Sequence, residues 1–434
     1  MDRRRRTPNA ERRTTQCITL FVVHLCLLIA APARADEAAR AVDQGRLRYS
    51  DGLPVVTLRG SPYEIGYQHG TLLRDEVRAA VADTLAFARR HYLRVPLIGA
   101  WIVNRVLDVV ADMERPHIPA DDLVELQGVA DGSGVRLQDL QRILAFADLS
   151  SSGCSSFVAF GRATADGRLL HGRNLDWNIQ AGIQRHAVIF VVHPAGRERR
   201  SFVSVGYAGF IGVLTGINSR GISVAQIGAA TADRTLRGMP MPLLLRQVLE
   251  RAASLDEAIA IVRNAPRTVG YNYVFADAKR KLAGVLETTK TLCAAFAPND
   301  PREASVAYAI TVPDAVFRAD TALDAAVRER QWASKGNPKQ PGLEPPGGSA
   351  YEVRYRGQGE RLREHVGALT TDDALAIMKA VAPPSNVQSV VFAYPDLWVA
   401  NARDLAPAAT QPYHHFNVRS LMGLTHRHPK RVMR

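Results

Sequence analysis

The chain has 434 residues, a formal net charge of +13 and four cysteines. A chain of this length buries enough apolar surface to fold without a disulfide. Beyond the first residues the basic side chains are scattered among acidic ones, which argues against a nucleic-acid-binding surface.

The first 35 residues have the features of a secretion signal. MDRRRR and a second arginine pair precede an apolar run, Cys17 to Ala30, and a small-x-small cleavage site ends at Ala35. The run is shorter than the ~20 apolar residues of a spanning helix, and no later stretch approaches that length. We expect residues 1–35 to be removed and the mature protein to be exported without a membrane span, in a bacterium to the periplasm, by either the Sec or the twin-arginine route.

Residues 36–153 are predicted to be mostly helical. Ser61 and Glu64 form a capping box around Pro62, which opens a long periodic stretch to Tyr92. Further helical patterns cover residues 98–114, 121–130 and 137–148.

From Cys154 onward the apolar period changes from 3.6 to 2, which predicts strands. The short spacings, with a hairpin turn at Asp166-Gly167, favour antiparallel pairing. The Pro/Gly-rich stretch 335–349 is predicted to be an exposed loop, and residues 425–434 a disordered basic tail. The predicted strands are 155–162, 169–174, 187–193, 201–205, 211–218, 222–227, 272–277, 281–286, 293–297, 388–393 and 397–400, and the predicted helices 241–251, 255–263, 351–366 and 371–381.

The Gly153-Cys154 junction lies where the helical pattern stops and the strands begin. If this peptide bond is cut, Cys154 carries both a thiol nucleophile and an α-amine whose ordinary pKa, about 7.7 to 8, suits a base. Before the cut, the same thiol can attack the carbonyl of Gly153, where glycine permits the strained turn of an N-to-S acyl shift. The alternative is a buried strand cysteine that only packs.

The residues around this junction resemble a known family. The segment from Cys154 through GRNLDW is similar to the autoproteolytic acyltransferase/hydrolase family typified by acyl-coenzyme A:6-aminopenicillanic acid acyltransferase, within the N-terminal-nucleophile hydrolase superfamily. SPYEIGYQHG and ELQGVADGSG resemble the prosegment of that family, and TGINSRGIS and YNYVFAD its later strands. The resemblance implies an α+β fold, a four-layer αββα sandwich of two stacked antiparallel sheets with a helical N-terminal prosegment.

The resemblance also implies site residues. Arg173 and Asp176 are the charged partners of Cys154: Asp176 would hold the new α-amine or its hydrogen-bond network, and Arg173 would favour the thiolate. Asn218 and Asn272 match positions of oxyanion-hole or α-amine contacts. Asn218 can equally be a turn residue before Gly221, whereas asparagine is disfavoured inside a strand pattern such as that of Asn272. Where the family often has an Asn-His pair, this chain reads AYAITVPDAVFRAD.

The expected activity is an exported amidohydrolase that cleaves a linear amide through a Cys154 thioester, without cofactor or metal. The expected division is a signal (1–35), a prosegment (36–153) that stays associated as a small subunit, and a catalytic region (154–434). An acyltransferase that passes the acyl group to an amine differs only in the acceptor. An unprocessed binding protein would remain one intact chain.

Two further alternatives concern the cysteines and histidines. Cys17 and Cys26 leave with the signal, so Cys154 and Cys293 remain and could pair in an oxidising compartment. A papain-like Cys-His enzyme would need a histidine base but has no local signature here. The candidates are His171, His193, His414 and His415.

Overall fold

The computed structural model describes residues 40–92, 98–149, 153–304, 306–334, 350–403 and 405–424. The predicted signal (1–35), the Pro/Gly-rich loop (335–349) and the basic tail (425–434) lie outside the described residues. Within the described ranges, no helix combines the length and apolar composition that crossing a membrane requires. In chain order the main elements are β1 (Arg40–Val42), β2 (Gly45–Ser50), β3 (Leu53–Gly60), α2 (Pro62–Leu72), α3 (Arg74–Tyr92), α4 (Ile98–Glu114), α5 (Ala120–Ser133), α6 (Leu137–Leu149), β4 (Cys154–Ala159), β5 (Leu170–Asp176), β6 (Ala187–Pro194), β7 (Phe202–Tyr207), β8 (Thr215–Asn218), β9 (Ile222–Gly228), α7 (Met241–Arg251), α8 (Leu255–Asn264), β10 (Tyr271–Asp277), β11 (Leu282–Thr288), β12 (Cys293–Phe296), β13 (Ala315–Arg318), α9 (Ala325–Ser334), η6 (Ala350–Arg356), α10 (Gly357–Glu364), α11 (Thr371–Ala380), β14 (Asn386–Ala393), β15 (Asp396–Asn401), β16 (His414–Asn417) and α12 (Val418–Leu421).

The N-terminal segment (residues 36–153) begins with three strands that the sequence analysis did not predict. β1, β2 and β3 pair in order, and β3 then runs parallel to β6, with Val56 opposite Phe190. The backbone of the N-terminal segment is therefore hydrogen-bonded into the same sheet as the strands that follow Cys154.

The helices of the N-terminal segment follow the predicted pattern with one break. The Ser61–Glu64 capping box is present, but the helix predicted to reach Tyr92 is divided at Leu73 into α2 and α3. α2 and α5 then meet at their glycines. A Cβ added at Gly66 would lie 2.0 Å from the carbonyl oxygen of Glu125, and one added at Gly128 would lie 2.4 Å from that of Tyr63. This backbone-to-backbone contact explains the glycines of SPYEIGYQHG and ELQGVADGSG.

The strands form two sheets. The ten-stranded sheet has the order β1-β2-β3-β6-β7-β8-β9-β10-β11-β12, and the six-stranded sheet has the order β13-β4-β5-β14-β15-β16. Neighbouring strands are antiparallel except β3 and β6, which are parallel. The connection between β3 and β6 contains α2–α6 and the strands β4 and β5 of the second sheet.

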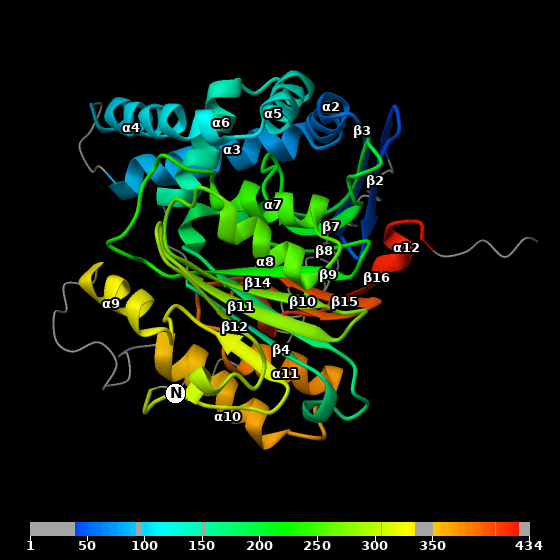
Figure 1. Cartoon of the computed structure of the whole chain (residues 1–434). Coiled ribbons are helices and arrows are strands. Elements are labelled where there is room, and N and C mark those ends of the chain that lie inside the picture. Colours follow the sequence, from blue (N-terminus) through cyan, green and yellow to red (C-terminus); the bar gives the residue numbers. More distant parts are fainter. Residues whose placement is uncertain are drawn as a thin grey trace, which may run out of the picture. The chain divides into compact units, whose positions relative to one another are not determined.

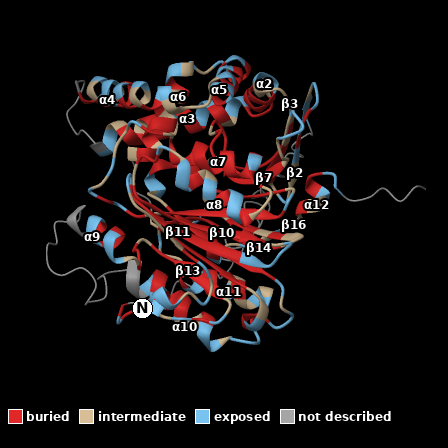
Figure 2. Ribbon diagram, in the orientation of Figure 1, coloured by how far each residue is buried: buried red, intermediate tan, exposed pale blue. Residues whose placement is uncertain are grey.

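Helices cover the outer face of each sheet (Figure 1). α7 and α8 pack against β8–β11 of the ten-stranded sheet, and α2–α6 lie on the same side. α11 packs against β5 and β14 of the six-stranded sheet. The central strands β10 and β14 are buried along their whole length and β9 in all but its last residue, as expected for strands covered on both faces (Figure 2). The predicted four-layer αββα sandwich is confirmed.

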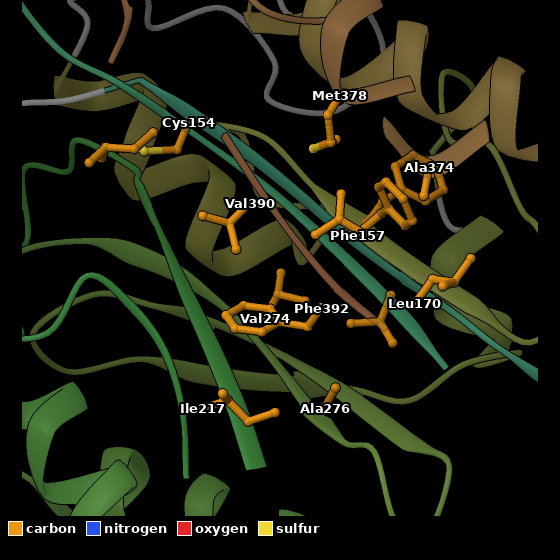
Figure 3. Packing of buried hydrophobic residues seen from close by; sticks show 14 of the residues in the cluster. Cys154, Phe157, Leu170, Ile217, Val274, Ala276, Ala374, Met378, Val390 and Phe392 are labelled. Carbon is orange, nitrogen blue, oxygen red and sulfur yellow. The ribbon is translucent and has the colours of Figure 1, made fainter. Parts of the chain in front are cut away.

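Alternate residues of each central strand fill two separate cores. In β10, Val274 and Ala276 join the core between the sheets, whereas Tyr273 and Phe275 join the core under the helices. Figure 3 shows the inter-sheet core, in which Cys154 lies among the labelled apolar side chains. The candidate nucleophile therefore occupies the end of a packed strand.

Candidate active site

Cys154 is the first residue of β4 and is completely buried. β4 pairs with β5 so that Cys154 lies opposite Leu175 and Ser156 opposite Arg173. The Sγ atom of Cys154 lies 3.9 Å from Nε2 of Gln226, which β9 presents from the other sheet. The strand thus places the thiol between the sheets.

Both polar groups of the Gly153-Cys154 peptide bond have protein partners. The carbonyl oxygen of Gly153 accepts a hydrogen bond from the backbone N–H of Asp176 at 3.0 Å. The N–H of Cys154 donates to Oδ1 of Asp320 at 3.0 Å. The peptide unit is therefore held at its oxygen and at its nitrogen.

Arg354 lies between two carboxylates beside this peptide bond. Its Nη1 donates to Oδ2 of Asp176 at 3.2 Å, and its Nη2 pairs with Oδ2 of Asp320. A Cβ added at Gly153 would lie 2.3 Å from Nη1 of Arg354. Because both carboxylates restrain this guanidinium, glycine is the residue that fits before Cys154.

Burial raises the pKa of Asp176 to about 7, against the lowering effects of Arg354 and of a hydrogen bond from Asn386. The Nδ2 of Asn386 donates to Oδ1 of Asp176 at 3.1 Å. At neutral pH this carboxyl therefore exchanges a proton rather than remaining fully ionised.

Arg173 and Asp176 point to opposite faces of β5, because an odd number of positions separates them. Arg173 faces between the sheets, where its Nε donates to Oγ1 of Thr215 at 3.2 Å and its Nη1 to the carbonyl of Asn174 at 2.8 Å. Its Nη2 has no hydrogen-bond partner among the described residues. Arg173 thus shares the face of Cys154, and Asp176 contacts the Gly153-Cys154 peptide unit through its backbone N–H.

The two predicted asparagines have different surroundings. Asn272, in β10, donates from Nδ2 to the carbonyl of Ala319 at 2.8 Å, directly before Asp320. Asn218 donates to the carbonyls of Leu249 and Ala252 and accepts from the backbone N–H groups that open β9. Asn272 therefore adjoins the site, whereas Asn218 makes the contacts of a turn residue that ties the β8–β9 hairpin to α7.

The four candidate histidine bases all have partners other than Cys154. His171 lies between Oγ of Ser156 and Oγ of Ser223, at 3.1 and 2.7 Å. Burial, with a smaller effect of Arg173, lowers the pKa of His171 to about 3, so it stays neutral. His193 contacts Ser201, and His414 and His415 lie beside aspartates. These contacts do not favour the papain-like alternative.

Cys154 and Cys293 both remain thiols. Among the described residues, no group of three His, Cys, Asp or Glu side chains could hold a metal ion.

An apolar cavity of about 50 Å³ lies beside the surroundings of Cys154. It shares Leu175 and Gln226 with the surroundings of Cys154. Burial raises the pKa of Tyr207, another wall residue, while Arg173 opposes this rise and Cys154 adds to it. The remaining wall is almost entirely apolar. Ala80 and Thr84 come from α3, and Ile143 and Ala147 from α6, both in the N-terminal segment. The other wall residues are Trp177, Ile183, Ala208, Phe210, Leu214, Met241 and Tyr271.

The sequence analysis did not identify Asp320, Arg354 or Gln226. Asp320 ends the stretch AYAITVPDAVFRAD, in which only the missing Asn-His pair was noted. Arg354 and Gln226 lie in segments without a motif, so no local signal could have selected them.

Comparisons with known proteins place this site in a family context. Residues 162–308 match the model of the family described as acyl-coenzyme A:6-aminopenicillanic acid acyl-transferase. The resemblance inferred from the sequence is confirmed. The matched region contains Arg173, Asp176, Asn218 and Asn272, and Cys154 lies just before it.

Two related sequences come from Dictyostelium discoideum. The chain is 30% identical to protein dcd1B of Dictyostelium discoideum over 58% of this chain and 53% of that protein. It is 29% identical to protein dcd1A of the same organism, over 49% of this chain and 53% of that protein. The chain thus spans about half the length of these curated relatives.

Similar solved structures include two described as hydrolases. The Caenorhabditis elegans N-acylethanolamine-hydrolyzing acid amidase ortholog is 16% identical, with a TM-score of 0.40 over 59% of this chain and 95% of that chain. A variant of the conjugated bile acid hydrolase from Clostridium perfringens is 15% identical, with a TM-score of 0.37 over 62% of this chain and 94% of that chain.

Proposed function

We propose that the protein is an amide hydrolase that cuts its own chain at Gly153-Cys154 and then uses Cys154 as an N-terminal nucleophile. The observation that carries this proposal is the environment of the Gly153-Cys154 peptide bond. Its carbonyl oxygen accepts a hydrogen bond from the N–H of Asp176, and its N–H donates to Asp320. Gln226, which lies next to the sulfur of Cys154, also lines the apolar cavity.

In the self-cleavage step, Sγ of Cys154 attacks the carbonyl carbon of Gly153. The C–N bond breaks, a thioester forms, and the thiol proton ends on the nitrogen, which becomes an amine. Water then hydrolyses the thioester, which leaves a carboxyl group on Gly153 and a thiol on Cys154. The N–H of Asp176 already donates to the oxygen that carries the developing negative charge.

In turnover, the α-amine of Cys154 takes the thiol proton and the sulfur attacks the carbonyl of a linear amide. The leaving amine takes that proton, and water releases the acid from the thioester. Gln226 would stabilise the tetrahedral oxyanion, because its Nε2 lies 3.9 Å from Sγ of Cys154. Asn272 is the second amide candidate, because it is buried and bonds the carbonyl of Ala319, directly before Asp320.

The cavity supports an apolar acyl group. Its walls are aliphatic and aromatic except for Thr84, Gln226 and the tyrosine hydroxyls. The acyl carbon would lie at the Gln226 end and the chain would extend toward α3 and α6. The N-terminal segment would then remain part of the enzyme after cleavage.

The fold supports a lasting association of the two pieces. β3 stays hydrogen-bonded to β6 whether or not the chain is cut, and Glu125 of α5 forms a buried ion pair with Arg246 of α7. We further propose that the protein is exported through the signal in residues 1–35. An acyltransferase remains the second candidate, because the matched family carries that description.

Mass spectrometry of purified wild type beside Cys154→Ala tests the proposal. The chain has a mass of 47.4 kDa, and removal of the signal followed by one cut gives wild-type pieces of roughly 13 and 31 kDa, the larger starting CSSFV. Cys154→Ala should stay intact and lose at least about 10³-fold in amide hydrolysis. Intact, inactive wild type would instead favour the binding protein. Adding an amine during turnover separates transfer from hydrolysis.

A further inference from the structure

Asp320 is placed opposite Cys154 by the register of the sheet edge. β13 pairs antiparallel with β4, with Ala315 opposite Ala159 and Arg318 opposite Ser156. Two residues beyond the end of β13, the same register brings Asp320 opposite Cys154. Its Oδ1 accepts the N–H of Cys154 at 3.0 Å, so the contact continues the ladder through a side chain.

The carboxylate of Asp320 is fixed from two further directions. Arg354 pairs with its Oδ2, and Nδ2 of Asn272 holds the carbonyl of the preceding Ala319 at 2.8 Å. Arg354 is itself held by Asp176. Arg354 therefore contacts this carboxylate directly, Asp176 acts on it through Arg354, and Asn272 acts on it through the carbonyl of Ala319.

We propose that Asp320 is a catalytic residue, the carboxylate that binds the α-amine of Cys154 after cleavage. This inference rests on the proposed cut at Gly153-Cys154. The nitrogen that donates to Asp320 in the uncut chain is the atom that becomes the amine, and it gains its proton from the thiol of Cys154. Asp176, to which the family resemblance assigned this contact, acts through Arg354 as a positioning residue.

The α-amine beside a carboxylate keeps its proton more strongly than a free one does. Asp320→Asn should therefore lower the pKa of the amine, and the acid limb of the kcat/KM profile should move to lower pH by about one unit. A residue that merely supports the fold would lower activity at every pH without moving this limb.

The experiment compares wild type, Asp320→Asn, Asp320→Glu and Asp314→Asn. Asp314 precedes the opposite end of β13 and pairs with Arg162, so its variant removes the same charge far from Cys154. Each protein is assayed for self-cleavage by mass spectrometry and for amide hydrolysis across pH. The pH-dependent labelling of the α-amine is followed on the tryptic peptide Cys154–Arg162.

Two results would support the assignment. Asp320→Asn is cleaved and both its acid limb and its labelling midpoint fall while Asp314→Asn matches wild type, or Asp320→Asn stays uncut while Asp320→Glu is cleaved. An unchanged pH profile in cleaved Asp320→Asn would overturn it, as would failure of both Asp320 variants to cleave. Wild type that is itself uncut would defeat the proposed function instead, which keeps the two failures distinguishable.

Discussion

Arg246 and Arg354 each pair with more than one carboxylate, and their positions relative to the proposed cut differ. Arg246 of α7 bonds Glu125 of α5 through both carboxylate oxygens, at 2.7 and 2.5 Å, and bonds Glu250 at 2.8 Å. Arg354 bonds Asp176 and Asp320. The first cluster joins residues from both sides of the cut, whereas the second is made entirely from residues that follow it.

This difference suggests separate roles: the Arg246 cluster for association of the two pieces, and the Arg354 cluster for self-cleavage and turnover. Under the proposed cleavage, a cluster shared by the two pieces would hold them together, because breaking it leaves buried charges unpaired. A cluster contained in one piece would keep its geometry when the neighbouring peptide bond breaks, so it could serve first the cut and then turnover.

The largest expected effect is that of Arg246→Met. Removing the guanidinium leaves Asp122, Glu125 and Glu250 without their buried cation, and the free energy of unfolding should fall by about 3–5 kcal/mol. Thermal unfolding and size-exclusion chromatography of the cleaved protein measure the loss of stability and of association. Arg356→Ala, which breaks the exposed Arg356–Glu360 pair, should cost at most about 0.5 kcal/mol. Equal losses of stability in Arg246→Met and Arg356→Ala would contradict the larger contribution predicted for the buried cluster.

Arg354→Ala should slow self-cleavage and leave the association of the two pieces intact. It releases Asp176 and Asp320 beside the scissile bond, so self-cleavage should slow by about 10²-fold. Any cleaved fraction should still elute as one complex, because the Arg246 cluster is intact. A time course of cleavage combined with size-exclusion chromatography measures both. Separated fragments would show that the Arg354 cluster also holds the pieces together.

Asp176 makes the stability of the uncut chain depend on pH. Because its folded-state pKa is raised to about 7, the folded protein keeps a proton that the unfolded chain releases above about pH 4. The stability of Cys154→Ala should therefore fall as pH rises from about 4 to 7, with a contribution of up to roughly 1.4 kcal/mol per pH unit from this group. Denaturant unfolding of Cys154→Ala with and without Asp176→Asn isolates that contribution, and identical slopes would contradict it.

The smallest expected effect concerns the acyl cavity. Ala147→Phe, in α6, should fill the cavity and reduce hydrolysis of a decanoyl amide about tenfold while an acetyl amide is hardly affected. Ala100→Phe, on the exposed face of α4, is the control. Equal losses on both substrates would mean that α6 does not line the acyl site.

The sequence by itself determined the elements and the candidate nucleophile. The change of period at Cys154 predicted the strands on either side of the inter-sheet core, and the Ser61 capping box fixed the start of α2. These signals are local, because period and capping act within a few residues. The strands β1–β3, β13 and β16 escaped prediction; among them, β3 pairs with β6 and β13 pairs with β4, each more than a hundred residues away in the sequence.

Only the tertiary structure decided which polar residues meet Cys154. Asp320 contacts Cys154 through the register of β13 on β4, and Arg354 of η6 pairs with Asp320; neither contact leaves a pattern in the local sequence. The same long-range packing ties Asn218, the last residue of β8, to the end of α7, and brings Asn272 to the carbonyl of Ala319, directly before Asp320. Side-chain partners depend on pairings between distant segments, which one-dimensional spacing does not encode.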